Sequence, residues 1–533
     1  MATHGTGANG PSYDCIIVGS GINGLVCAAM LGKKGYSVLV LERESEFGGC
    51  IRTGEVTLPG YIHDLLSGFH PLFVTSPGYA ALGDDLHARG LAYANDAYPT
   101  GVLMSDGRSL IMARDRACNV TAFDACAAGD GAAFDAAMAS VASSADLTFS
   151  LLGNDLWTGK MMANLAKAAW QMGPADLANY FGEALVTARD WLEGAFASAQ
   201  LRALLAPWVL HTGLGPDQAA SGYMAKVIAF SLEVAGMPVV TGGSSKLVEA
   251  FRSLIADQGG TMLSGADVRH IHLAKGTARG VELSDGRRFT ANRGIFCSVT
   301  PDALYTRLLP EGAVPHTRRE KARNFRFGRG DMQIHLALDR PVHWPDPSLG
   351  KTAMIHLCDG IDDVARAVTL ANAGLLPDRP TIVVGQPTAN DPSRVPPGKG
   401  LLWLQLQELP HHVKGDAAGT IATPPDGAWT PEVAQHYADR VIDRMESFVP
   451  GIKASIIKRT VLSPADLEAM NCNLVGGDPY AGDCALDQSF LWRPLKISKS
   501  HRTPVKQLYH IGASTHPGPG LGGVSGFIAA SYL

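Results

Sequence analysis

Three glycines near the start of the chain have a spacing suited to binding phosphate. Gly19, Gly21 and Gly24 form the pattern GxGxxG within the segment GSGING. In this pattern the first glycine permits a tight turn, the second lets the backbone approach a pyrophosphate, and the third lets a helix pack closely on a strand. A helix that begins at this turn directs its N-terminal amides and its dipole at the phosphate charge. The spacing therefore predicts a dinucleotide site.

The residues on both sides of the glycines are typical of the elements that such a site requires. The short apolar run Tyr13–Gly19 predicts a buried strand, and the small, apolar residues of Leu25–Leu31 predict a helix packed on a sheet. After Gly35, the run Tyr36–Leu41 predicts a second buried strand. Glu42 follows it, where a carboxylate accepts hydrogen bonds from ribose hydroxyls and repels a 2′-phosphate. The alternative is a bare glycine turn in an unrelated α/β fold.

The glycine pattern by itself fits both FAD and NAD, but the residues after the second strand favour FAD. The segment ERESEFGGCIRT, from Glu42 to Thr53, resembles the ER-x4-GG-x3-T continuation of FAD enzymes in the amine oxidase and phytoene desaturase superfamily. The resemblance implies that its glycine pair brings backbone amides against the FAD pyrophosphate. Many amine oxidases carry Arg directly after that pair. This chain has Cys50 there, so Arg52 is the candidate for supplying the charge.

A second resemblance lies near the C-terminus. The segment LYHIGASTHPGPGLGGVSG, from Leu508 to Gly526, is similar to the closing motif of bacterial phytoene desaturases, carotenoid ketolases and the related mitochondrial pyridine nucleotide-disulfide oxidoreductase domain proteins. In that family the segment runs along the ribityl chain and points a helix N-terminus at the pyrimidine edge of the flavin. Amides at a helix start stabilise the negative charge of reduced flavin. The resemblance implies Gly522, Gly523 and Val524 as donors.

A third segment, Gly242–Ile271, resembles the turn, helix and strand of the same family, in which an Asp-Val pair presents its backbone to adenine. Val268 is the matching residue. The chain is thus similar to phytoene desaturase and carotenoid ketolase-like FAD oxidoreductases of the flavin amine oxidase superfamily. The candidate cofactor-binding residues are Gly19, Ser20, Gly21, Asn23, Gly24, Glu42, Arg43, Gly48, Gly49, Arg52, Val268, Gly512, Ala513, Gly522, Gly523 and Val524.

The resembling segments imply an α/β fold in which a discontinuous Rossmann-type FAD-binding domain carries an inserted α+β substrate domain with a helical cap. We expect the FAD-binding domain to comprise residues 1–75, 238–305 and 501–533, and the substrate domain residues 76–237 and 306–500. Ala-, Leu- and Met-rich stretches between Asp115 and Gly236 predict the helical cap. Separate strands are expected at Arg288–Ala291 and Gly294–Val299, and a last helix at Phe527–Tyr532.

Few residues are candidates for the chemistry itself. His516 lies within the C-terminal motif and is the candidate catalytic residue; the alternative is a histidine that only hydrogen-bonds the loop or the FAD phosphates. Asp64 matches an acidic position common in the family, and its alternative role is capping or turn hydrogen bonding. Hydride removal from an unactivated hydrocarbon depends mainly on positioning and on exclusion of water. A catalytic base is therefore not required.

Composition excludes several other functions. A net charge of -5 provides no basic field for nucleic acid. The nine cysteines are odd in number and scattered, unlike a secreted disulfide framework, and no Cys/His cluster has zinc-ligand spacing, so we expect no metal site. No apolar run reaches the roughly 18 to 20 residues that span a bilayer. We therefore expect a cytoplasmic protein whose membrane contact, if any, is peripheral.

Taken together, the sequence predicts an FAD-dependent desaturase or dehydrogenase that moves a hydride from a C–H bond of a small hydrophobic substrate to flavin. No second GxGxxG follows a strand and no CxxxxC pair is present, so NAD(P)H is not the expected electron donor. Dioxygen or a quinone is the expected acceptor. Two alternatives stay open: an amine or alcohol oxidase, which would favour polar or aromatic anchors near the flavin, and a scaffold or chaperone-like protein with structural FAD.

Overall fold

The chain forms two seven-stranded sheets, and the computed structural model describes residues 10–533. The first sheet has the strand order β10-β11-β12-β1-β2-β9, and β20 also pairs with β12. Its strands are β1 (Ser12–Val18), β2 (Val38–Leu41), β9 (Thr261–Leu263), β10 (Val268–Ala274), β11 (Thr277–Leu283), β12 (Arg288–Ser298) and β20 (Leu508–Ile511). β1, β2, β9, β12 and β20 pair in parallel. Their near-continuous apolar character suits a parallel sheet that is buried on both faces.

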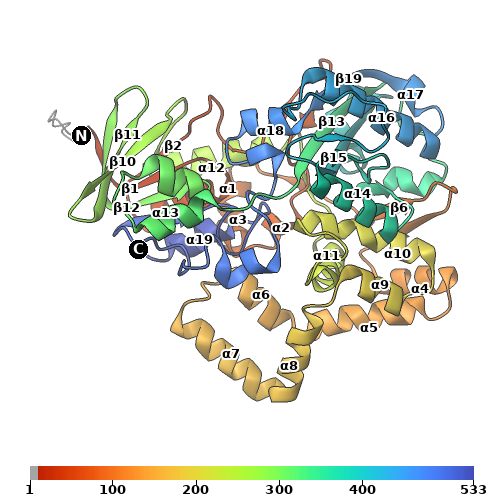
Figure 1. Cartoon of the computed structure of the whole chain (residues 1–533), viewed down its shortest axis with the longest axis horizontal. Coiled ribbons are helices and arrows are strands. Elements are labelled where there is room, and N and C mark those ends of the chain that lie inside the picture. Colours follow the sequence, from red (N-terminus) through yellow and green to blue (C-terminus); the bar gives the residue numbers. More distant parts are fainter. Residues whose placement is uncertain (1–9) are drawn as a thin grey trace.

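Helices on one face of this sheet join segments that are far apart in the chain. α1 (Ile22–Lys33) connects β1 to β2, and it packs with α12 (Ser245–Asp257) and α19 (Val524–Ala530) in one apolar core. In Figure 1 the N-terminal, middle and C-terminal parts of the chain meet in this half of the molecule. The α/β fold class with a discontinuous Rossmann-type domain is therefore confirmed, whereas the exact domain boundaries stay a prediction.

The second sheet has the order β19-β13-β17-β16-β14-β6-β7. Its strands are β6 (Thr100–Leu103), β7 (Ser109–Met112), β13 (Gly330–Leu338), β14 (Met354–Leu357), β16 (Ile382–Gly385), β17 (Gly400–Leu409) and β19 (Ile456–Leu462). Alternate residues of β13 and β17 pack against α16 (Pro431–Phe448) in an apolar core. The opposite face of the sheet is turned toward the helical cap.

The helical cap follows β7. It consists of α4 (Arg116–Cys126), α5 (Asp130–Ser143), α6 (Ala145–Gly153), α7 (Gly159–Met172), α8 (Pro174–Glu183), α9 (Ala188–Ala195), α10 (Ala199–Leu205), the 3-10 helix η1 (Ala206–Thr212) and α11 (Ser221–Ala235). α4, α5 and α9 to α11 share one apolar core with the second sheet, whereas α7 and α8 project from the body of the molecule (Figure 1). Among residues 10–533, no helix is both long enough and apolar enough to cross a membrane.

Two elements differ from the sequence expectation. β12 is one continuous strand, because its parallel pairing with β1 continues on both sides of a register shift between Ala291 and Gly294. The last helix begins at Val524 rather than at Phe527, because Gly523 takes a left-handed conformation with φ 67° and caps it. Glycine adopts that conformation without steric cost.

A buried ion cluster connects the two halves of the molecule. The side chain of Arg394 is fully buried; its Nη1 donates to Asp64 Oδ2 at 2.9 Å and its Nε to Asp391 Oδ2 at 2.8 Å. Asp64 Oδ1 also accepts from the Ser244 amide at 2.8 Å and from Thr53 Oγ1 at 2.6 Å. Asp64 thus connects Thr53 in the segment after β2, Ser244 in the turn before α12, and Arg394 in the substrate domain. This role is larger than the capping or turn hydrogen bond that the sequence suggested.

We predict that Arg394→Met lowers the free energy of unfolding by about 3 to 5 kcal/mol, because it leaves two buried carboxylates without their cation. The matched control is Lys246→Met, which removes a solvent-exposed pair with Glu249 and should cost at most about 1 kcal/mol. Denaturant titration of both variants at equal cofactor occupancy provides the measurement. Equal losses in the two variants would refute the special role of the cluster.

Candidate active site

A cavity lies at the C-terminal edge of the parallel strands. β1, β2 and β12 all end at it, and this edge is where open α/β sheets bind ligands. Seven of the residues predicted from sequence line it, namely Gly19, Gly21, Glu42, Arg43, Gly49, Arg52 and Val268. They come from both the N-terminal and the middle segments of the chain. The fold therefore brings these candidates together in one site.

Each glycine of the first motif has a distinct steric reason to be glycine. Gly19 has φ +95°, which other residues rarely adopt. A Cβ on Gly24 would lie 2.1 Å from the Gly19 carbonyl oxygen, so this glycine permits the close contact of α1 with the loop. A Cβ on Gly21 would meet nothing within 4 Å, and Gly21 has an ordinary φ of -59°. The space above Gly21 is thus open to a ligand such as a pyrophosphate.

The carboxylate of Glu42 is held in the cavity wall. Its Oε2 accepts from the Ser20 amide at 2.8 Å and from Ser20 Oγ at 2.6 Å, while Oε1 accepts from the Glu44 amide at 3.0 Å. Ser20 Oγ in turn accepts from the Gly48 amide at 3.0 Å. Ser20 and Gly48 therefore orient the wall rather than line the cavity. Because each carboxylate oxygen has two lone pairs, Oε1 retains capacity for a ribose hydroxyl.

The two arginine candidates have different surroundings. Arg52 Nε donates to the Gly49 carbonyl at 3.1 Å and Nη2 to the Met470 carbonyl at 3.0 Å, so its charge stays next to the glycine pair. Arg43 is half-exposed and pairs with Glu44 at 3.1 Å. Of the two, Arg52 is better placed to offset the charge of a phosphate. This agrees with the sequence expectation that Arg52 supplies the charge, since Cys50 replaces the arginine that many amine oxidases have after the glycine pair.

Sequence patterns did not identify one wall of the cavity. It is formed by Asn471, Cys472 and Asn473, which follow α18 (Pro464–Met470), together with Ser298 at the end of β12. Asn473 Nδ2 donates to the Ser298 carbonyl at 3.1 Å. These residues belong to no motif that we found, and only the tertiary fold brings them to the site.

Cys50 is packed within this region. Asn471 Nδ2 lies 3.3 Å from Cys50 Sγ, and burial raises the pKa of the Cys50 thiol. A thiol with a raised pKa is a poor nucleophile at neutral pH. Cys50 is therefore suited to packing rather than to nucleophilic chemistry.

The C-terminal motif lies beside this cavity without lining it. Gly512 directly follows β20, and a Cβ there would lie 3.1 Å from Ser298 Oγ in the cavity wall. Gly523 packs against α1, where a Cβ would lie 2.6 Å from Val26 Cγ2. Asn23 Oδ1 accepts from the Gly526 amide at 3.3 Å and so connects α1 to α19. A glycine at 523 is thus required by packing, whether or not a flavin is bound.

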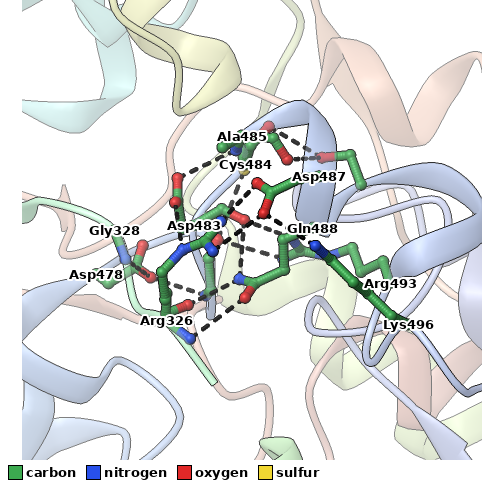
Figure 2. A network of polar contacts seen from close by, with 12 residues as sticks. Arg326, Gly328, Asp478, Asp483, Cys484, Ala485, Asp487, Gln488, Arg493 and Lys496 are labelled. Carbon is green, nitrogen blue, oxygen red and sulfur yellow. Dashed lines mark hydrogen bonds and ion pairs between the residues drawn. The ribbon is translucent and has the colours of Figure 1, made fainter. Parts of the chain in front are cut away.

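An arginine that sequence reasoning missed holds the C-terminal motif in place. Arg493 is buried, and its Nε and Nη2 donate to the Ala513 carbonyl at 3.0 and 2.9 Å. The same guanidinium donates to the carbonyls of Tyr480 and Asp483 at 2.9 and 3.2 Å. Figure 2 shows this guanidinium within the polar network of residues 478–496. Arg493 therefore cross-links the motif to the loop before it.

Asp478 orders the other side of that loop. Its Oδ2 accepts from the amides of Gly328 and Gly482, each at 2.7 Å, and its Oδ1 from the Tyr480 amide at 2.8 Å. Burial raises the pKa of the Asp478 carboxyl, an effect that the three amides oppose. In Figure 2 Asp478 lies beside Gly328, the residue that leads toward β13. The loop is thus fixed to the second sheet by Asp478 and to the C-terminal motif by Arg493.

His516, the candidate catalytic residue, is buried against the end of α6. Both ring nitrogens are buried and have no hydrogen-bond partner among the described residues, and burial lowers the pKa of the ring to about 4, so it is uncharged at neutral pH. Its carbonyl oxygen accepts from His501 Nε2 at 2.9 Å. A role for His516 at the reacting atoms stays a prediction.

The second sheet presents a row of buried polar side chains on the face toward the cap. Asp331 and Gln333 alternate along β13, with Trp403 and Gln405 opposite on β17. Asp331 Oδ2 accepts from Gln333 Nε2 at 2.8 Å and from Gln405 Nε2 at 2.7 Å, and Trp403 Nε1 donates to Gln333. Asp331 is only 1% exposed, and its Oδ1 has no partner among the described residues. Burial raises the pKa of this carboxyl well above its ordinary value.

Two contacts link this polar face to the loop after Asp64. His335, the next residue of the face along β13, lies with its Nε2 3.1 Å from the Leu65 carbonyl. The rings of Phe69 and Trp403 lie 6.1 Å apart, within the range of aromatic contact. Residues 65–69 therefore border the polar face, and Gln407 Nε2 of β17 donates to Tyr480 Oη of the Asp478–Arg493 loop at 2.9 Å.

Comparisons with known proteins bear on this site. The family model for flavin-containing amine oxidoreductases matches residues 22–439. Pyridine nucleotide-disulfide oxidoreductase domain-containing protein 2 of Mus musculus is 28% identical, covering 99% of this chain and 95% of that protein. The 4,4'-diapophytoene desaturase of Staphylococcus haemolyticus is 23% identical, covering 95% of each. The family resemblance inferred from the sequence motifs is thereby confirmed.

A solved structure has the same fold. Putrescine oxidase bound to putrescine superposes with a TM-score of 0.60 at 15% sequence identity, covering 98% of each chain. The residues present here fit an FAD group: the space above Gly21 is open, and Glu42, Arg52 and the glycine pair border it. FAD is therefore the cofactor of this fold, as the motifs predicted.

We predict that Gly21→Val yields a folded protein that does not retain FAD. Valine meets no protein atom at this position but occupies the space a pyrophosphate needs. The measurement is the ratio of flavin absorbance to protein in the purified variant, with circular dichroism as the test of folding. Gly24→Val is the contrasting variant and should misfold, because its side chain collides with the Gly19 carbonyl. Full FAD content in Gly21→Val would show that the cofactor lies elsewhere.

Proposed function

The chain belongs to the flavin-containing amine oxidoreductases, and from this premise we propose that it removes a hydride from a C–H bond of a hydrophobic substrate, giving a C=C or C=O product. Bound FAD would supply the acceptor for the hydride, and dioxygen or a quinone would then take up the two electrons. The observation that carries this proposal is the single cavity that collects candidate residues from distant segments at the C-terminal edge of the first sheet.

Residues of the chain would contribute mainly by binding and positioning. Glu42 is suited to hold the ribose, and Arg52 to offset phosphate charge beside Gly49. Arg493 would keep the C-terminal motif at a fixed distance from the second sheet. The helical cap covers the polar face and excludes water, which strengthens every electrostatic interaction inside. This division of labour requires no catalytic base.

A second candidate, oxidation of an amine or alcohol, is favoured by one specific observation. The face around Asp331 combines a buried carboxyl that has one unpartnered oxygen with the amides of Gln333 and Gln405 and the ring of Trp403. Such polar and aromatic anchors are what a substrate with a hydrogen-bonding group requires, because an unsatisfied buried polar atom is costly. A pure hydrocarbon would leave Asp331 Oδ1 without a partner.

We predict that the oxidised flavin bleaches under anaerobic conditions on mixing with a substrate of the correct class and does not bleach with NADH or NADPH. The panel is an acyclic polyene, a long-chain primary amine and a long-chain alcohol, each followed at the flavin absorbance maximum. Bleaching by the polyene supports the first proposal, and bleaching by the amine or alcohol supports the second. Fast, saturable bleaching by a nicotinamide nucleotide would refute both, and no bleaching by any compound would favour a scaffold with structural FAD.

We predict that Asp331→Asn raises KM for a hydrogen-bonding substrate by about fivefold to a hundredfold, since leaving a buried polar group without its hydrogen-bond partner costs about 1 to 3 kcal/mol. Its effect on a polyene should be slight. Asp339→Asn, a half-exposed acid directly after the same strand, is the matched control. Unchanged KM values for all three compounds in Asp331→Asn would remove the basis for the second candidate.

A further inference from the structure

Exposed apolar side chains are concentrated on the projecting helices of the cap. Between residues 149 and 185, the large apolar residues that are at least 44% exposed are Phe149, Trp157, Met162, Trp170, Phe181 and Leu185, and Trp170 is 89% exposed. α8 buries no residue, and α7 buries only Met161. A concentration of exposed apolar residues on this scale marks an interaction surface. We call α6 to α8 with their connecting residues the hairpin.

The exposed residues of α7 form two stripes. Met162, Ala166 and Trp170 are four residues apart, so they share one face of the helix. Lys160 and Lys167 are exposed on the neighbouring face. α7 itself carries no acid, so the charges along this helix are positive, whereas the exposed acids Asp176 and Glu183 lie on α8.

The base of the hairpin is fixed to the C-terminal motif. Asp155, between α6 and α7, accepts at Oδ2 from Tyr532 Oη at 2.6 Å, and it is buried. His516, within the motif, faces the backbone at the end of α6. The hairpin therefore begins beside the segment that the family uses around its flavin, and it extends outward from there (Figure 1).

Further exposed apolar residues belong to loops around the same motif. Leu72 of α2 (Pro71–Val74) is 51% exposed and borders Gly520, where a Cβ would lie 2.5 Å from Leu72 Cδ1. Leu491 and Trp492 are each 41% exposed and directly precede Arg493, which is bonded to Ala513. Exposed apolar residues therefore lie on the hairpin and also on the segments that contact the motif.

We propose that the hairpin and these loops dock on the surface of a phospholipid bilayer, so that a hydrophobic substrate or acceptor passes between the lipid and the site. Tryptophan is favoured at the membrane interface, and lysine stems beside an apolar stripe allow their charges to reach the headgroups. The two exposed lysines of α7, a helix that carries no acid, complement anionic lipid phosphates. A second copy of the chain fits less well, because a symmetric pairing of α7 stripes would bring four lysines together.

The proposal is tested by flotation of the intact oxidised protein with vesicles of phosphatidylcholine, alone and mixed with phosphatidylglycerol. We expect binding to both and tighter binding to the anionic mixture. Trp170→Glu and Met162→Glu should each weaken binding by about tenfold or more, because a charged group replaces buried apolar surface. Both residues are exposed, so folding should be unaffected. Val234→Glu, at an exposed residue outside the hairpin and its loops, is the control and should bind like the wild type.

Three outcomes would overturn the proposal. The wild type could fail to float with either vesicle, or both hairpin variants could bind as tightly as the wild type. Alternatively, light scattering could show a dimer that Trp170→Glu dissociates, with no vesicle binding, in which case the surface joins two copies of the chain. None of these measurements depends on turnover, so failure of the membrane proposal is distinguishable from failure of the proposed reaction.

Discussion

Burial of the Arg394 guanidinium is the constraint on which the relative placement of the two sheets depends. A fully buried cation is tolerated only when it is paired and hydrogen-bonded, and Asp64 and Asp391 provide that pairing. Since Asp64 also accepts hydrogen bonds from Thr53 and Ser244, the cofactor half and the substrate half share one set of polar contacts. The loop after Asp64 leads directly to Leu65 and Phe69, which touch the polar face of the second sheet.

The Asp478–Arg493 loop performs the same task at the other end of the site. The Asp478 carboxylate accepts hydrogen bonds from backbone amides, and the Arg493 guanidinium donates to backbone carbonyls. These bonds hold the loop in place although it has little regular secondary structure. Because Gly328 and Ala513 are the outer partners of these two charges, the loop sets the spacing between β13 and the C-terminal motif. Such networks are rigid when every member is satisfied.

The two faces of the second sheet carry side chains of opposite character, one apolar and the other largely polar. Alternate residues of β13 and β17 are apolar and pack against α16, whereas those between them are Asp331, Gln333, Trp403 and Gln405. Burying so many polar groups weakens folding unless they are bonded, and a chain selected for stability alone would have apolar residues there. An amphiphilic substrate, with an apolar body and one hydrogen-bonding group, would suit both this face and the apolar hairpin that begins beside the C-terminal motif.

The sequence by itself determined the features that depend on neighbouring residues: the glycine turn between β1 and α1, Glu42 after β2, and the glycine pair. Local spacing is sufficient there, because steric limits at glycine and strand periodicity act over a few residues. Only the tertiary structure decided the roles of Arg394, Arg493, Asp331 and Asn471. The partners of Arg394 and Asn471 include Asp64 and Cys50, which are 330 and 421 residues away. No short-range pattern encodes such contacts, because they form only when separate segments pack together and a buried charge or amide must find a partner.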